Sequence, residues 1–421
     1  MKKKTLLVTY QLFAIIAVAI LFTACKKDSG TSTKNTKTIT LYTPVYGSKA
    51  TALASINGNA AQPIKHAGKI YIKVNFIFLN DQNKGIHVID NSNPSHPVSI
   101  AFLSIPGNLD IAIKGNTLYA DMYNDLLALD ITDIHHAAVT HTLENFFTGR
   151  SYVNGFSTNV DDKVVTEWIE RDTVVTQEYY PYSGCDFCVG ADVLTMTPAG
   201  VKSSGTAGSM AGMVLMNDHL YAITEMHSLG IVDITNPAIP TLDSNFFAGF
   251  DLQTVFPFKG KLFLGSAVGM FMYDVTDPKH PVAVGEFSHG RACDPVIADE
   301  HYAYVTLHAG DGCGGDANEL HVIDINNLQN AQLVKTYQMI KPTGLSKDGN
   351  LLFVCDDTEV KVYNAANPAN LLLLKKIKSN QPYDVITFGN KAMVVCSDGL
   401  YQYDYSNINN IRQLSFVAAK K

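Results

Sequence analysis

A short motif that recurs along the chain constrains the fold more than any other feature. In each copy an apolar strand ends in Asp or Asn, and a second Asn or Asp, often followed by Pro, stands three residues further on. The copies recur about every forty residues, with two predicted strands before each one and a single strand after it, which is the pattern of four-stranded propeller blades. The residue that ends the strand is Asp90, Asp130, Asp233, Asp274, Asp324, Asn364 or Asp404.

One interval, from Asp130 to Asp233, spans 103 residues and is long enough for two blades. Within it, residues 159–170 (NVDDKVVTEWIE) predict a hairpin followed by a strand, and residues 191–200 (ADVLTMTPAG) predict another strand with its turn. We therefore expect an all-β chain that folds as a single β-propeller of eight four-stranded antiparallel blades, in which residues 151–209 form a divergent third blade. Seven blades is the alternative.

The motif also predicts the chemistry of its turn. The Asp at the end of the strand can accept a hydrogen bond from the backbone N–H two residues further on, and Asn or Asp before Pro starts a tight turn. Each turn supplies too few oxygen atoms for a calcium site. We therefore interpret these carboxylates as turn residues and expect neither a metal ion nor a cofactor.

The N-terminus is typical of an exported lipoprotein. Three lysines at 2–4 precede an apolar run at 12–22 that is too short to cross a membrane comfortably. The run ends in Phe-Thr-Ala-Cys, which resembles the lipobox of bacterial lipoproteins, where the chain is cut before the cysteine and the cysteine is acylated. The predicted segments are a signal peptide at 1–24, a flexible tether at 25–40 that starts with the lipidated Cys25, an N-terminal lead-in segment at 41–62 and the propeller at 63–421.

The strand-end motifs GIVDITNP and HVIDNSNP resemble those of the LVIVD-repeat β-propeller lipoprotein family, and the resemblance covers about residues 63–421. It implies a lipid-anchored propeller on the cell envelope but no established reaction. No Asp follows Cys25, which resembles lipoproteins that are sent on to an outer membrane. We therefore expect the protein in the cell envelope, anchored by its lipid, on the outer membrane.

Charge and motifs limit the class of partner. The formal net charge is −7, and loss of the signal peptide removes three lysines and no acidic residue. An acidic surface argues against nucleic acid as a partner, because phosphates require a basic surface. The sequence contains no HExxH, Walker loop or nucleophile elbow, so we expect no catalytic residue. The expected partners are the membrane, through the lipid, and an unidentified envelope or extracellular protein or glycan.

Blade geometry predicts which loops act together. With strands a to d running alternately up and down, the d–a and b–c loops share one face, here called the top face. The two longest insertions, at 170–190 and 308–318, are both b–c loops, and long loops on a rigid scaffold often carry binding sites. The candidate binding face lies near the top end of the central channel and comprises Asp110, Asp294, Asp384, His289, Arg291 and His308.

The candidate face allows more than one interpretation. Its three carboxylates could hold a cation or a polar ligand, or they could be solvated acids in a wet channel. His and Arg beside a carboxylate could also serve acid–base chemistry. The favoured function is a non-enzymatic binding module, and the alternative is an envelope enzyme that acts on polysaccharide.

The cysteines suggest two disulfides. Cys293 and Cys313 fall in top-face loops of one blade, and a bridge between them would contribute roughly 3 kcal/mol. Two further cysteines in the first insertion are too few for a structural zinc site and are predicted to form a local disulfide in the oxidising envelope. These are Cys185 and Cys188. The last two occupy equivalent strand positions and are interpreted as small core residues, namely Cys355 and Cys396.

Overall fold

The computed structural model describes residues 35–177, 209–292, 295–309 and 315–420. These residues belong to two compact units. The first holds residues 35–41 and 170–177, and the second holds the rest, including every blade. No helix in the described ranges is long and apolar enough to cross a membrane. Several predicted residues lie outside the described ranges, namely Cys25, Cys185, Cys188, Cys293, Asp294 and Cys313.

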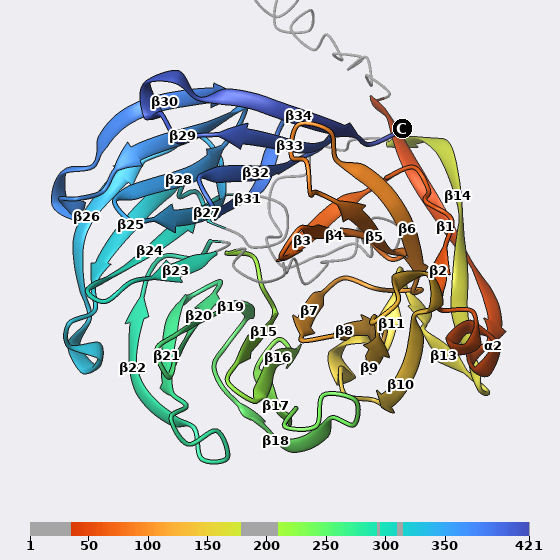
Figure 1. The fold of residues 1–421 in the computed structure, drawn as a ribbon. Helices are drawn as coiled ribbons and strands as arrows, with labels where there is room; N and C mark the ends of the chain where they lie inside the picture. Colours follow the sequence, from red (N-terminus) through yellow and green to blue (C-terminus); the bar gives the residue numbers. More distant parts are fainter. Residues whose placement is uncertain (1–34, 178–208, 293–294, 310–314, 421) are drawn as a thin grey trace, which may run out of the picture. The chain divides into compact units, whose positions relative to one another are not determined.

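The described residues of the second unit form seven antiparallel blades, each with four strands in chain order from the inside of the ring to the outside (Figure 1). Blade one consists of β3 (Ala67–Lys73), β4 (Phe76–Asp81), β5 (Gly85–Asp90) and β6 (Val98–Ser104), and β2 (Gly58–Asn59) adds a fifth strand. Blade two consists of β7 (Ile111–Lys114), β8 (Thr117–Met122), β9 (Asp125–Asp130) and β10 (Ala138–Leu143). Blade three consists of β15 (Met213–Met216), β16 (His219–Glu225), β17 (Ser228–Asp233) and β18 (Thr241–Phe247).

The other four blades repeat this arrangement. Blade four consists of β19 (Leu252–Phe258), β20 (Lys261–Ser266), β21 (Gly269–Asp274) and β22 (Val282–Ser288). Blade five consists of β23 (Val296–Ala298), β24 (Tyr302–Leu307), β25 (Glu319–Asp324) and β26 (Gln332–Gln338). Blade six consists of β27 (Pro342–Asp348), β28 (Leu351–Asp356), β29 (Glu359–Asn364) and β30 (Leu372–Lys378). Blade seven consists of β31 (Pro382–Phe388), β32 (Lys391–Cys396), β33 (Gly399–Asp404) and β34 (Arg412–Ala418).

Helices are few and short among the described residues. The one α-helix is α2 (Lys49–Ala54), which precedes blade one. The 3₁₀ turns are η1 (Ile134–His136), η2 (Thr148–Arg150), η3 (Leu328–Asn330), η4 (Pro368–Asn370) and η5 (Ile408–Asn410). All but η2 lie between the third and fourth strands of a blade, where the recurring motif predicts a tight turn.

The blades of the second unit form a ring. Each innermost strand contacts the innermost strand of the next blade, and β3 contacts β32 of blade seven. Residues before β3 complete this junction, because Ile64 forms a parallel bridge with Ala419 and its carbonyl oxygen accepts a hydrogen bond from Lys420 N at 2.7 Å. The all-β propeller expected from the repeat is therefore confirmed.

The expected eighth blade is not confirmed. The innermost strands β7 and β15 of blades two and three contact each other directly, and the described residues of 151–209 form no sheet between them. Two short strands there pair with each other, β11 (Tyr152–Val153) with β12 (Phe156–Ser157). The next two, β13 (Asn159–Val160) and β14 (Lys163–Gln177), join β1 (Asn35–Ser48) in a three-stranded sheet. The hairpin at 159–170 is real, but its partner comes from the N-terminal segment expected to be tether and lead-in.

Burial decreases from the inside of each blade to the outside. Strand β8 of blade two is buried at all six positions, because its two faces pack on the neighbouring blades. The outer strand β18 contains only exposed and partly buried residues. Cys355 and Cys396 are unpaired and buried between blades six and seven, as their strand positions predict.

The predicted turn chemistry is confirmed in all seven blades. The side-chain oxygen of each motif residue accepts a hydrogen bond of 2.7–2.9 Å from the backbone N–H two residues further on. At Asp90 and Asp130 this residue is Ser or Thr, and its hydrogen bonds hold the pKa of the carboxyl group below its usual value. The repeated Asp is thus a turn-forming group, which explains its period of one per blade.

Candidate functional site

Two of the three predicted channel carboxylates are described, and both are fully buried. Asp110 precedes β7 and Asp384 lies near the start of β31, so each stands where an innermost strand begins. Both are 0 % exposed. Lys69 in β3 occupies the equivalent position in blade one and is also buried. These carboxylates are therefore internal groups of the ring and are not solvated acids.

Asp110 belongs to a network that balances its charges. Lys69 Nζ lies 2.9 Å from Asp110 Oδ2, and Ile111 N donates to Asp110 Oδ1 at 2.9 Å. Nearby in β8, Asp121 accepts hydrogen bonds from the backbone N–H of Asp110 at 2.8 Å and from the guanidinium of Arg150. Burial lowers the pKa of Lys69 to about 8, although Asp110 opposes this effect.

The segment 209–212 crosses the inner ends of the blades. Ser209 Oγ donates to Asp384 Oδ1 at 3.4 Å and accepts from Leu345 N in blade six at 2.8 Å. Only three residues later, Gly212 N donates to Asp110 Oδ2 in blade two at 3.2 Å. This segment is itself buried, so its hydrogen bonds link the two carboxylates inside the ring.

The other predicted residues lie in or beside top-face loops. Arg291 has an exposed side chain and pairs with Asp251 of the preceding blade, its Nη2 lying 3.0 Å from Asp251 Oδ2. His289 is partly buried, and its ring centroid lies 6.3 Å from that of His321. His308 is buried. The structure thus brings Arg291 to an acidic partner that sequence analysis did not single out.

A cluster of aromatic side chains, two of them exposed, lies beside this pair. We call Phe247, Phe250 and His227 the aromatic platform. The ring centroids of Phe247 and Phe250 are 5.1 Å apart, and that of His227 lies 5.6 Å from Phe250. Phe247 is 56 % exposed and Phe250 is 58 % exposed, so each presents more than half of its surface to solvent. The platform joins the b–c turn of blade three to the d–a loop that enters blade four.

Hydrogen bonds hold the loop of the platform in place. Ala248 N donates to His227 O at 2.8 Å, and Leu252 N donates to Met226 O at 2.7 Å. Asp251 N donates to Nδ1 of His227 at 3.2 Å. Asp251 then binds Arg291 through its carboxylate, so loops of blades three, four and five form one connected surface.

A groove with a volume of about 540 Å³ borders the platform. Its walls carry the two phenylalanines of the platform with Phe271 and Tyr273 of β21, and Glu286 of β22 adds a carboxylate. Gly249 makes this geometry possible, since its φ is +150° and a Cβ would lie 2.6 Å from the ring of Phe271. The arrangement offers aromatic faces with a few polar groups, which suits a ligand that has both apolar and polar surface.

The sequence contains a signal for the platform that the analysis missed. Strand d of blade three ends in Phe247, whereas the same strand ends in Ser, Gln, Lys or Ala in blades one and four to seven. Blade two has Leu at this position, so Phe247 is the one aromatic residue that ends strand d in the seven blades, and Phe250 follows it three residues later.

Among the described residues, a single group of His and acidic side chains could hold a metal ion, namely His219, Asp233 and Asp243. It lies at the end of blade three opposite the platform, because β16 begins at His219 and ends at Glu225, next to the platform turn.

Comparisons with known proteins support the repeat and the fold. The model of the LVIVD repeat matches residues 65–101, 207–247 and 289–339. No curated protein matches the chain. Similar solved structures include the computationally designed Ika8 protein, with a TM-score of 0.52 and 10 % identity over 87 % of this chain and 92 % of that one.

Two natural proteins are similar to the same extent. The periplasmic gluconolactonase PpgL of Pseudomonas aeruginosa has a TM-score of 0.50 and 11 % identity over 80 % of this chain and 93 % of its own. Sqt1 of Saccharomyces cerevisiae has a TM-score of 0.51 and 9 % identity over 87 % of this chain and 89 % of its own. Identities this low show the fold alone. The recurring strand-end motif, the blades and the matched repeats together show that the chain is a β-propeller that carries LVIVD repeats.

Proposed function

We propose that the protein is a non-enzymatic binding module, held on the outer membrane by a lipid on Cys25, which captures an envelope or extracellular protein or glycan on its top face. The observation that carries this proposal is the aromatic platform. Its exposed rings stand on hydrogen-bonded loops at one face of a rigid ring, and they border a groove.

The composition of this surface supports binding. Aromatic residues, Met and Arg are enriched where proteins bind partners, and the residues that dominate affinity are commonly large, rigid side chains. The platform supplies two phenylalanines, and the exposed Met226 and Arg291 lie beside it. Its groove of about 540 Å³ also lies in the range of roughly 300–1,000 Å³ that ligand sites occupy.

The alternative, an envelope enzyme acting on polysaccharide, has less support. A general acid or base must reach the proton that it transfers, within hydrogen-bond distance of the substrate. Asp110 and Asp384, the described carboxylates of that alternative, are 0 % exposed and bound to groups of the ring. Neither carboxylate is therefore accessible to a polysaccharide in this structure.

Replacing both phenylalanines of the platform, Phe247→Ala with Phe250→Ala, is expected to weaken ligand capture at least about tenfold, because each ring is a candidate hot spot. Binding would be measured on a glycan array and by cross-linking to intact envelopes, with each captured ligand then titrated against the purified protein. The matched control is Val74→Ala with Phe388→Ala, which removes apolar side chains that are 74 % and 56 % exposed on the opposite face. Equal loss in both double variants, or no loss in either, would contradict the assignment of the platform.

The variant Cys25→Ser is expected to move the protein from the membrane fraction to the soluble fraction, because each buried CH₂ of an acyl chain contributes about 0.8 kcal/mol to anchoring. Fractionation after a high-salt wash, followed by immunoblotting, measures the change. Ser29→Ala, in the same predicted tether, serves as the control and should remain with membranes. If Cys25→Ser stays in the membrane pellet, something other than the lipid anchors the protein.

A further inference from the structure

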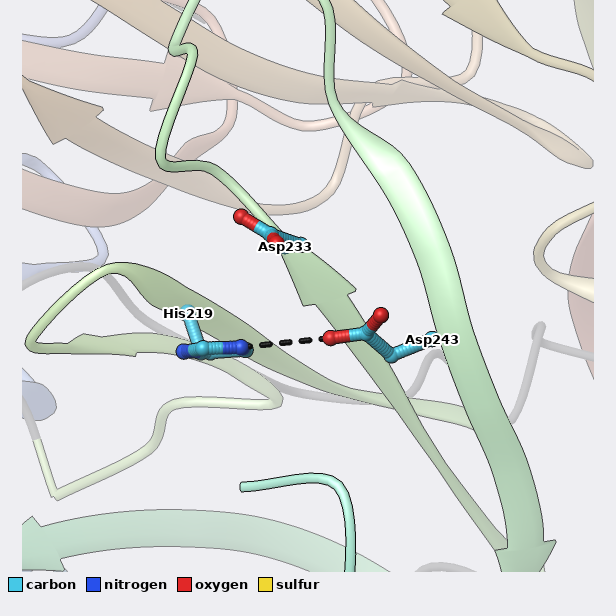
Figure 2. Close-up of side chains that lie close together, drawn as sticks. All are labelled: His219, Asp233 and Asp243. Atoms are coloured by element: carbon cyan, nitrogen blue, oxygen red, sulfur yellow. Dashed lines mark hydrogen bonds and ion pairs between the residues drawn. The ribbon is translucent and has the colours of Figure 1, made fainter. Parts of the chain in front are cut away.

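Three side chains with metal-ligating atoms converge at the end of blade three opposite the platform (Figure 2). His219 begins β16, Asp233 ends β17, and Asp243 lies in β18. In the ladder, His219 is the direct partner of Asp233. The three residues therefore come from three adjacent strands of one sheet, whose spacing the backbone ladder fixes.

A β-bulge places Asp243 in this group. In the pairing of β17 with β18, Ile231 faces Ser244 and Val232 faces Leu242, so Asp243 is the extra residue. Every other blade has a register shift at the same place in its outer strand pair. The bulge is thus a property of the repeat, and blade three differs only in the side chain that it carries there.

The distances suit a shared cation. One ligand atom from each of the three residues lies within 4.8 Å of the other two. His219 Nε2 lies 3.2 Å from Asp243 Oδ2 (dashed line in Figure 2). Ligands bound to tetrahedral zinc at about 2.0–2.2 Å are themselves about 3.3 Å apart, so this pair already has the spacing of two ligands. Asp233 uses Oδ1 for the backbone N–H of Thr235 at 2.7 Å, which fixes the orientation of its carboxylate.

The other blades show what blade three lacks. In blade four, the position of His219 is Lys261, whose Nζ lies 2.8 Å from the motif carboxylate of Asp274 and supplies a positive charge there. The bulge position in blades one, two and four to seven carries no acid. It is Ile100, Thr140, Val284, Val334, Leu374 or Leu414.

Blade three replaces the lysine by imidazole and adds a second carboxylate, and both changes favour an external cation. The hydrogen bonds from Thr235 lower the pKa of the Asp233 carboxyl group, and the positive charge of nearby Lys279 lowers it further. The side chains of His219 and Asp243 are 13 % and 15 % exposed, so this imidazole and this carboxylate have little access to water, and the carboxylate of Asp233 adds a second negative charge beside them. Such a site favours binding of a positive ion.

We propose that His219, Asp233 and Asp243 bind one divalent transition-metal ion, Zn²⁺ in preference to Ca²⁺. Imidazole nitrogen with carboxylate oxygen is a ligand set of zinc, whereas calcium takes six to eight oxygen atoms, more than this group offers. Three protein ligands leave a fourth position for water. Bound metal would cross-link β16, β17 and β18, and this assignment stands apart from the function of the top face.

The test is titration of the purified full-length protein with Zn²⁺, followed by calorimetry and by direct metal analysis after dialysis. His219→Gln and Asp243→Asn are each expected to bind one Zn²⁺ fewer than the wild type, or to bind it at least tenfold more weakly. Asp274→Asn, which changes the same motif position in blade four, is the matched control and should keep the wild-type stoichiometry. Any zinc ion that cysteines hold is bound by the wild type and the variants alike, so the difference in the number of bound ions reports on this site alone.

Thermal unfolding gives a second readout. Zn²⁺ should raise the Tm of the wild type and of Asp274→Asn more than that of the two site variants, because a ligand that binds only the folded state stabilises it. Ca²⁺ at the same concentration should produce no such difference in Tm between the two site variants and the other two proteins. If wild type, His219→Gln and Asp243→Asn bind the same number of zinc ions with the same affinity, the site does not exist. A stronger response to Ca²⁺ would overturn the choice of metal.

Discussion

Replacing Asp121 by asparagine is expected to lower the free energy of unfolding by roughly 3–5 kcal/mol, the usual cost of breaking a buried ion pair by removal of one charge. Asp121 is 0 % exposed in β8 and accepts hydrogen bonds from Leu109 N at 2.9 Å and Asp110 N at 2.8 Å. Its other oxygen binds the guanidinium of the buried Arg150. Asparagine offers one acceptor oxygen in place of two and leaves the arginine without this counter-charge.

The matched control for this prediction lies in the next strand of the same blade. Asp130 is exposed, and its carboxylate accepts from Thr132 N at 2.8 Å. Asparagine already performs this role in blade six, where Asn364 accepts from Ala366 N at 2.9 Å. Asp130→Asn should therefore cost less than about 1 kcal/mol. Urea unfolding followed by circular dichroism measures both variants, and equal losses would show that the Asp121 network contributes nothing beyond a turn.

The contrast between these two aspartates shows what the sequence can predict. The position of Asp130 is Asp or Asn in every repeat, and its hydrogen bond reaches only two residues along the chain. A repeat of about forty residues therefore predicts local turn chemistry of this kind and the strand that each turn ends. The repeat thus predicts the strands, the turns and the propeller, all of which the structure contains.

Partners that are distant in sequence were not predictable in the same way. Sequence analysis identified the channel position at Asp110 and Asp384 but missed the equivalent Lys69. Without a basic partner, the two carboxylates were expected to face water or a ligand. Both carboxylates instead accept hydrogen bonds from the segment 209–212, which contacts blades that lie more than a hundred residues apart in the chain. No repeat pattern encodes such a contact.

The eighth blade was expected for a related reason. A hairpin has the same alternating pattern whether its neighbour is the next strand of a blade or a strand from elsewhere. In β14, Thr166 Oγ1 donates to Val45 O of β1 at 3.2 Å, and Trp168 Nε1 donates to the hydroxyl of Tyr123 at 3.2 Å. These partners lie 121 and 45 residues away in sequence. The sequence therefore predicts the hairpin but not its pairing.

Removal of the buried cation from the channel wall is expected to be as costly as the loss of Asp121. Lys69→Met leaves the carboxylate of Asp110 buried beside the backbone N–H of Ile111 and Gly212 but without its lysine, at a cost of roughly 3–5 kcal/mol at pH 7. Adding Asp110→Asn removes the carboxylate charge that has lost its lysine, and it keeps one of the two acceptor oxygens that Ile111 N and Gly212 N use. The double variant should therefore be more stable than Lys69→Met alone, and urea unfolding of the four proteins of this cycle measures the difference.

The pH dependence gives this pair a distinct signature. Burial lowers the pKa of Lys69 to about 8, whereas the unfolded chain keeps the ordinary value of 10.5. Between these values the unfolded state binds more protons than the folded state, so the wild type gains stability as pH rises. Lys69→Met lacks this gain, and the difference between wild type and variant should grow by roughly 1–2 kcal/mol from pH 7 to pH 9.5. Subtracting the variant removes the contribution of the buried tyrosines, which both proteins share. A difference that shrinks with rising pH would mean that the lysine stays charged in the folded protein, stabilised by Asp110 more than it is destabilised by burial.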